Sequence, residues 1–224
     1  RAVVNVVNKG NVYLVAQKGT SPRDRNFAAY VKGKRVATGL YSGTPNSITR
    51  YLLGQWGLDV KKDVMLMEST NAALLAAMKT KNADIAVVSE PTLTQGIRQG
   101  IWDEPFFNVP KELGDYAYST LNIRKESIDT EPQVVAGFVK AIVKGLKFTY
   151  ENPKQAAEIA KKEFPTMALE DLTATIDRAF ADNLWSKDGK ITPASWTTGS
   201  KVVRSADLLK QDVAYGDIID MRFV

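Results

Sequence analysis

Between residues 35 and 88, three apolar segments alternate with two segments of helical periodicity, and this alternation constrains the fold more than any other feature. The apolar segments cover residues 35–39, 64–67 and 84–88. Continuous apolar strands that alternate with helices are typical of a parallel sheet whose two faces are both covered. We therefore predict an α/β fold with the order β-α-β-α-β in this region.

The two helices of this region carry recognisable start signals. Thr44 can cap the first helix, and Pro45 suits its first helical position. Thr70 or Asn71 begins the second helix, which carries apolar residues at helical spacing.

The flanking segments predict further elements of mixed type. Residues 3–7 and 12–16 have the pattern of strands, and residues 116–123 alternate as expected for a half-exposed antiparallel strand. Helical patterns dominate after residue 131, with predicted helices over residues 131–151, 153–164, 170–184 and 194–210. The tail, residues 215–224, is expected to be irregular.

The composition excludes many enzyme classes. The chain has 224 residues and contains neither Cys nor His. It therefore cannot form a thiolate nucleophile, a disulfide, a Ser-His-Asp triad or a zinc site ligated by His or Cys. We expect no catalytic residue, no metal and no cofactor.

The charge pattern indicates a solvated surface. The net charge is +5, but the sequence contains no run of five basic residues. The densest basic sets, at residues 32–35 and 61–62, adjoin predicted strand starts. We interpret them as solvated positions and expect no nucleic-acid partner, which would require a clustered basic face. No apolar run approaches the about 20 residues of a membrane helix.

Three segments follow the carboxyl ends of the predicted parallel strands, where open sheets bind their ligands. They are residues 39–46, 69–71 and 89–91, and we call them the rim. Glycines in the first segment allow close backbone approach, and a helix N-terminus favours an anionic group such as carboxylate, sulfonate or phosphate. The candidate ligand-binding residues are Tyr41, Ser42, Gly43, Thr44, Asn46, Ser69, Asn71, Ser89 and Glu90.

Simpler roles compete with binding at these positions. Ser42 and Thr44 can serve only as helix caps, and Glu90 can be a solvated turn residue instead of an acceptor for a ligand amine or hydroxyl. Tyr41 can stack on a ligand or pack on the neighbouring helix. The segment lacks the glycine patterns of nucleotide-binding loops, which disfavours a nucleotide. Residues 102–107 combine acids with aromatics, but adjacent acids point apart, so we expect no catalytic pair there.

An ordered set of segments resembles one known family. Its members are the substrate-binding proteins of ABC importers that serve nitrate, sulfonates, taurine and thiamine-pyrimidine precursors, the SsuA, TauA and NMT1-like group. The matching stretches are KGKRVA, SGT, LGQWGLD, NAALLAAM and ADIAVVSEP, followed by FVKAIVKGLKFTYENP and the tail YGDIIDMRFV.

The resemblance implies a two-lobed type II periplasmic-binding-protein fold, with solute clamped between the lobes by hinge closure. It implies that residues 1–17 are a remnant of lobe 1 and the entry strand, residues 18–122 are lobe 2, and residues 123–224 return to lobe 1. Most of the first half of lobe 1 has no counterpart in this sequence.

The resemblance further implies a non-catalytic protein that binds a small anionic solute and delivers it to a membrane permease. We expect a monomer in the periplasm, or an extracytoplasmic protein anchored to the membrane. One alternative is an NMT1-like enzyme of thiamine-pyrimidine biosynthesis, which consumes a histidine in that family and is disfavoured because this chain has none. Another is the effector domain of a transcription regulator, which the long helical C-terminal third disfavours.

Overall fold

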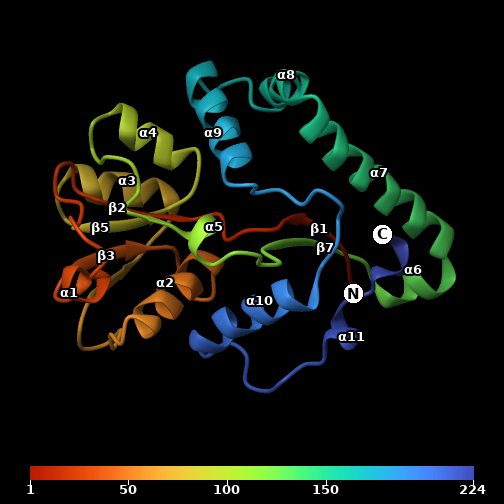
Figure 1. The fold of residues 1–224 in the computed structure, drawn as a ribbon, viewed down its shortest axis with the longest axis horizontal. Coiled ribbons are helices and arrows are strands. Elements are labelled where there is room, and N and C mark those ends of the chain that lie inside the picture. The colour runs from red at the N-terminus through yellow and green to blue at the C-terminus, as the bar shows by residue number, and fades with distance from the viewer. The chain divides into compact units, whose positions relative to one another are not determined.

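The computed structural model describes the whole chain, from Arg1 to Val224. Its internal contacts divide the chain into two compact units, whose elements are labelled in Figure 1. The five-stranded unit comprises residues 11–112 and 200–210, and the two-stranded unit comprises residues 1–10, 113–199 and 211–224. The chain therefore passes from one unit to the other four times.

The five-stranded unit is built on one mixed sheet. Its strands are β2 (Tyr13–Ala16), β3 (Arg35–Thr38), β4 (Met65–Glu68), β5 (Ile85–Val88) and β6 (Phe107–Asn108), in the order β4-β3-β5-β2-β6. β3 pairs in parallel with both β4 and β5. β2 lies antiparallel to β5 and β6. The predicted parallel β-α-β-α-β region is confirmed, and the predicted strand at residues 12–16 makes the sheet mixed.

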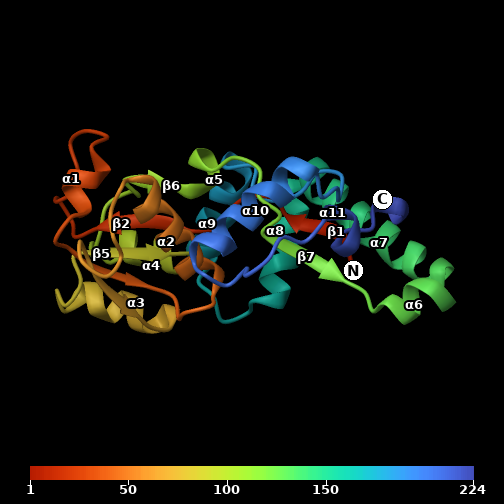
Figure 2. The ribbon, with the colours of Figure 1, turned by 90° about the horizontal axis from the view of Figure 1, so that it is seen from below.

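Helices cover both faces of this sheet. They are α1 (Phe27–Val31), α2 (Thr44–Gln55), α3 (Asn71–Lys79), α4 (Thr92–Arg98) and α5 (Val109–Glu112). Figure 1 shows α3 and α4 above the sheet and α1 and α2 below it, and Figure 2 gives the same elements from below. This arrangement follows from topology, because right-handed crossovers toward opposite edges of a sheet place their helices on opposite faces.

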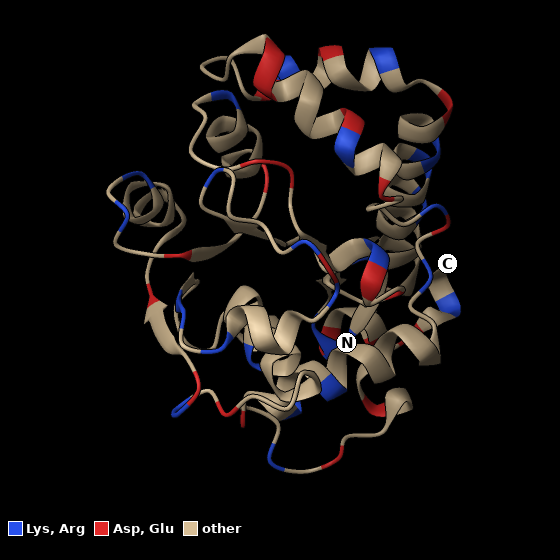
Figure 3. Ribbon diagram, turned by 60° about the vertical axis from the view of Figure 1, so that its left-hand side comes forward, with Lys and Arg blue, Asp and Glu red and all other residues tan.

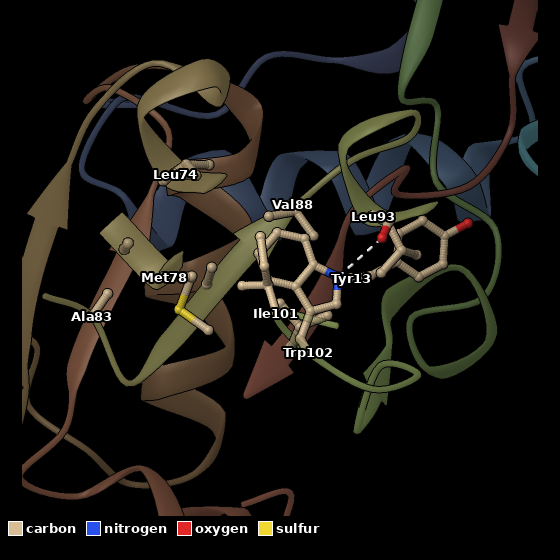
Figure 4. Packing of buried hydrophobic residues seen from close by; sticks show 11 residues of the cluster. Tyr13, Leu74, Met78, Ala83, Val88, Leu93, Ile101 and Trp102 are labelled. Atoms are coloured by element: carbon tan, nitrogen blue, oxygen red, sulfur yellow. Dashed lines mark hydrogen bonds between the residues drawn. The ribbon is translucent and has the colours of Figure 1, made fainter. Parts of the chain in front are cut away.

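The hydrophobic core beneath α3 and α4 contains the buried indole ring of Trp102 (Figure 4). Trp102 is 1% exposed, and its Nε1 donates a 2.9 Å hydrogen bond to the carbonyl of Leu93. Gly96 of α4 leaves room for this ring, since a Cβ there would lie 2.0 Å from the indole. On the other face, the Trp56 ring packs 5.4 Å from that of Phe27. Trp102 therefore belongs to the buried core, and Trp56 is half-buried in an aromatic cluster.

The two-stranded unit is a helical assembly around one antiparallel pair. β1 (Ala2–Val7) pairs with β7 (Ser119–Asn122), as predicted for a half-exposed antiparallel strand at residues 116–123. Its helical elements are α6 (Lys125–Thr130), α7 (Pro132–Glu151), α8 (Pro153–Glu163), α9 (Leu169–Ala181), α11 (Tyr215–Ile218) and the 3-10 turn η1 (Met221–Phe223). Helix α10 (Pro193–Ser205) begins in this unit, and its last residues belong to the five-stranded unit. α7 buries Val135 and Val139 against Val3 and Val4 of β1.

Three predictions need correction, two at helix ends and one in the tail. The predicted helix 170–184 ends at Ala181, and the predicted helix 194–210 ends at Ser205. In each case a residue soon after the end, Asn183 or Asp207, has a positive φ that stops the helix. The tail is not irregular, because it contains α11 and η1, and the Asp220 side chain caps η1 by accepting from the Arg222 N–H.

Charges of both signs are interspersed along the ribbon in Figure 3. Residues of both basic sets singled out in the sequence pair with acids: Lys32 with Asp63 at 3.2 Å, Arg35 with Asp84 at 2.7 Å and Lys62 with Asp59 at 3.7 Å. These pairs agree with the interpretation of both sets as solvated surface.

Candidate functional site

The rim is formed by the ends of three adjacent parallel strands. β3, β4 and β5 end at Thr38, Glu68 and Val88, and each leads directly into one of the predicted segments. The Ser69 N–H donates a 2.9 Å hydrogen bond to the Thr38 carbonyl, which extends the pairing of β3 and β4 to the rim. The structure therefore brings segments 39–46, 69–71 and 89–91 to the same edge of the sheet.

The first segment is a tight turn that begins α2. Ser42 is exposed and has a φ of 69°, a conformation that residues other than glycine rarely adopt. Gly43 is the N-cap residue and donates from its N–H to the Leu40 carbonyl. A Cβ on Gly43 would lie 3.0 Å from that carbonyl oxygen, so a side chain there would crowd the turn.

Thr44 does not cap α2, contrary to one sequence interpretation. It is the first residue of the helix, and no side chain makes a capping hydrogen bond at this end. Pro45 has no N–H, so the first turn leaves the N–H groups of Thr44 and Asn46 without a partner inside the helix. Asn46 is fully buried, so the half-buried Thr44 supplies the donor that a ligand can reach, with a polarity that suits an anion.

Tyr41 is held in place from two directions. Its hydroxyl donates a 3.1 Å hydrogen bond to the Ala206 carbonyl, and the Arg50 guanidinium carbon lies 5.2 Å from the ring centre. The residue is still 47% exposed, as is its neighbour Leu40 at 57%. The alternative of packing on a neighbouring helix therefore holds in part, and much of the ring remains open.

Asn46 lies beneath the rim and not on its surface. It is fully buried, and its Nδ2 donates to the Gly39 carbonyl at 2.9 Å and to Glu68 Oε1 at 3.0 Å. Arg50 completes the network by donating from Nε to Asn46 Oδ1 and from Nη2 to Glu68 Oε1. These contacts fix the first segment against the end of β4, so the Asn46 side chain supports the rim.

The second segment is open. Asn71 is exposed as the first residue of α3, and the Ser69 hydroxyl is oriented toward the Thr70 carbonyl at 3.4 Å. Thr70 is the N-cap residue, and its side chain makes no capping hydrogen bond. The N–H of Asn71, like that of Thr44, has no partner within its helix.

The third segment is hydrogen-bonded to the helix that follows it, α4. Glu90 accepts from the Thr94 N–H at 3.0 Å and from the Thr94 hydroxyl at 2.8 Å, while the Ser89 carbonyl accepts from the Leu93 N–H. The Glu90 carboxylate thus caps the start of α4, which replaces the interpretation as a solvated turn residue. Ser89 and Glu90 are half-buried and contribute to the wall of the rim.

Arg50 and Glu68 were not among the residues selected from the sequence. Arg50 follows Asn46 by four residues, which places both on one face of α2, and this spacing is the signal that could have found it. Glu68 is the last residue of β4, 18 positions further along the chain, and only the folded sheet brings it to Arg50.

A cavity of about 630 Å³ lies at the opposite end of the strands. Arg35, Asp84, Gln17 and Lys18 are among its lining residues. Hydrogen bonds from the Arg35 guanidinium hold the pKa of the Asp84 carboxyl below its usual value. Gln17 donates to the Met78 and Ala83 carbonyls, so much of this lining is already engaged in holding the fold.

Comparisons with known proteins agree on one family. The model of the NMT1-like family matches residues 3–162. The chain is 20% identical over 210 residues to YtlA of Bacillus subtilis (strain 168), which is named as a binding protein, covering 93% of this chain and 62% of YtlA. It is 24% identical to the nitrate/nitrite binding protein NrtA of Synechocystis sp., covering 77% of this chain and 39% of NrtA.

Solved structures show the same fold. The alkanesulfonate-binding protein SsuA of Xanthomonas axonopodis pv. citri, bound to MOPS, superposes with a TM-score of 0.71 at 13% identity. The match covers 98% of this chain and 73% of SsuA. The predicted periplasmic-binding-protein fold is thus confirmed. The chain is shorter than its neighbours and spans less than two thirds of the two curated relatives.

Proposed function

Because the chain belongs to the NMT1-like family, we propose that it is the solute-binding component of an ABC importer, which captures a small anionic solute for a membrane permease. The relatives that match are named as binding proteins, for nitrate and nitrite in one case and alkanesulfonates in another. This supports a binding role without catalysis for the present chain, at an extracytoplasmic location. None of the helices is both long enough and apolar enough to cross a membrane.

One observation carries the proposal. The helices α2 and α3 begin at the ends of two neighbouring parallel strands, and the accessible backbone donors of Thr44 and Asn71 at these starts lack helical partners. Partial positive charge at two helix N-termini favours an anion more than either start alone. We propose that these donors, with Ser42, Gly43 and Ser69 beside them, hold the anionic group of the solute.

Side-chain charge contributes little to this selectivity. The one cation at the rim, Arg50, already forms an ion pair with Glu68 at 2.8 Å. Glu90 adds a negative charge that is bonded to its own helix. Backbone donors and not a net positive charge therefore select the anion, as is suited to a ligand that must also be released.

The backbone role can be tested with Asn71→Pro. Proline removes the N–H but is tolerated at the first position of a helix, and Thr70 already has the extended φ and ψ that precede proline. Calorimetric titration with methanesulfonate, nitrate and taurine should show weaker binding of at least one anion by about fivefold, the effect of about 1 kcal/mol.

The matched control is Leu169→Pro at the first position of α9, where Ala168 is also extended and Leu169 is exposed. It should bind like the parent chain. Equal affinity of the Asn71→Pro variant and the parent chain for every anion would refute the backbone role. If the parent chain itself bound none of the three anions, the proposed function would fall with it.

A further inference from the structure

The exposed ring of Tyr41 provides the strongest clue to what the solute carries besides its anionic group. Contiguous exposed apolar side chains, unlike single ones, often mark a site that binds a ligand. Leu40 and Tyr41 are consecutive, both are exposed, and both lie in the segment that leads into α2. We ask which chemical group would cover them.

The ring has a fixed orientation. Its hydroxyl is tied to the Ala206 carbonyl, and its face is covered by the Arg50 guanidinium. Arg50 is itself anchored, at 2.7 Å to Asn46 and at 2.8 Å to Glu68. A side chain held in this way loses little conformational entropy when a ligand stacks on it, and this favours affinity.

The position of Arg50 also changes what the ring prefers. The face of an aromatic ring is negative and normally repels an anion. The Arg50 guanidinium over one face attracts the π electrons of the ring, so a planar group with a nearby negative charge meets less repulsion on the opposite face. The pairing of Arg50 with Tyr41 thus suits an anion with a flat, unsaturated body.

Chain geometry limits the size of that body. Tyr41 and Thr44 are three residues apart, so their Cα atoms are at most about 11 Å apart. We therefore expect a small body, with the ring attached directly to its anionic group.

We propose that Tyr41 is a specificity-determining residue, which stacks on a compact planar anion such as an aromatic sulfonate or carboxylate and favours it over alkyl and inorganic anions. The proposal rests on the function proposed above, because it assumes that the rim binds the anionic group. Arg50 acts through Tyr41 as a positioning residue.

The test compares two probes with six carbons each, benzenesulfonate and hexanesulfonate, with nitrate as a third. Calorimetric titration of the parent chain should show benzenesulfonate bound about tenfold more tightly than hexanesulfonate, as expected for one aromatic contact. Tyr41→Ala should bring this ratio close to one. Tyr41→Leu keeps an apolar side chain and should also bring the ratio close to one. Agreement of the two variants would show that the effect does not come from a folding defect in the alanine variant.

Tyr30→Ala is the matched control. Tyr30 also donates its hydroxyl to a carbonyl, that of Thr20, and carries a cation over its ring, Lys34 at 5.6 Å. It lies on α1, outside the rim, so its loss should leave the ratio unchanged.

A ratio near one in the parent chain, or a ratio that survives both Tyr41 substitutions, would overturn the specificity proposal. If nitrate or hexanesulfonate still bound, the function proposed above would stand. Failure of all three probes to bind would count against both proposals.

Discussion

The Arg50 guanidinium lies 5.2 Å from the centre of the Tyr41 ring while it forms a 2.8 Å ion pair with Glu68 at the end of β4. One side chain thus joins the start of α2, the turn before it and the neighbouring strand. Its charge is paired within the protein, so any attraction of the rim for an anion has to come from backbone donors.

Replacement of Arg50 should loosen this part of the molecule. Arg50→Met removes two charge-assisted hydrogen bonds and leaves the half-buried Glu68 carboxylate with only the Asn46 amide. The free energy of unfolding should fall by about 1–2 kcal/mol, since hydrogen bonds to charged groups contribute that much when partly exposed. Urea unfolding measures the change, and Arg23→Met, at an exposed position, should change it by less than about 0.5 kcal/mol. Equal effects of both substitutions would contradict the network.

Gly96 should tolerate no side chain. A Cβ at this position would lie 2.0 Å from the Trp102 indole, so Gly96→Ala must displace the ring and its hydrogen bond to Leu93. We expect the free energy of unfolding to fall by about 3 kcal/mol or more, which is at the upper end of the values for overpacked cores. The near-ultraviolet circular dichroism of Trp102 should also change. Gly54→Ala, in a helix with open space around it, should instead stabilise by about 0.5–1 kcal/mol. A neutral Gly96→Ala would show that the ring is not packed as described.

The ion pair of Arg35 with Asp84 should make the free energy of unfolding depend on pH in the acidic range. Hydrogen bonds from Arg35 lower the pKa of Asp84 in the folded chain, so the pair stabilises fully above the unfolded pKa, near 3.9, and loses this effect as pH falls through the folded pKa. Asp84→Asn should therefore reduce stability at pH 7, by less than about 1 kcal/mol because both side chains are partly exposed.

The difference between the parent chain and Asp84→Asn should shrink as the pH is lowered from about 5 to below 3. Urea titrations at several pH values measure it, with exposed Asp177→Asn as the control. A difference that stayed constant down to the lowest pH would mean that the ionised Asp84 carboxylate does not stabilise the fold.

The parallel core of the fold was predictable because its strands are continuous apolar runs. Such runs at residues 84–88 and 64–67 indicate strands whatever their neighbours do, and the intervening helices have two or more turns of regular spacing. Helices α4 and α5 escaped prediction because seven and four residues contain too few turns to establish a period.

Topology correctly predicted that the three rim segments meet at one edge of the sheet, but it did not predict the contacts of their side chains. The sequence cannot show that Asn46 is fully buried or that Glu90 is bonded to Thr94, since burial and hydrogen bonding depend on the folded backbone. Likewise, the N-cap residue is Gly43 and not the predicted Thr44, because the turn at Ser42 has a left-handed φ. Nothing in the residue type of Ser42 demands this conformation. The contact of Arg50 with Glu68 spans 18 residues and appears only when β3 and β4 pair.

The location of the binding site is tested most directly by nuclear magnetic resonance of the ¹⁵N-labelled chain during titration with methanesulfonate. We predict saturable shifts of backbone amides concentrated at residues 39–46 and 69–71, with the donors of Thr44 and Asn71 among the most affected. Shifts concentrated instead at the cavity lined by Gln17, Arg35 and Asp84, or no saturable shift at all, would contradict the account.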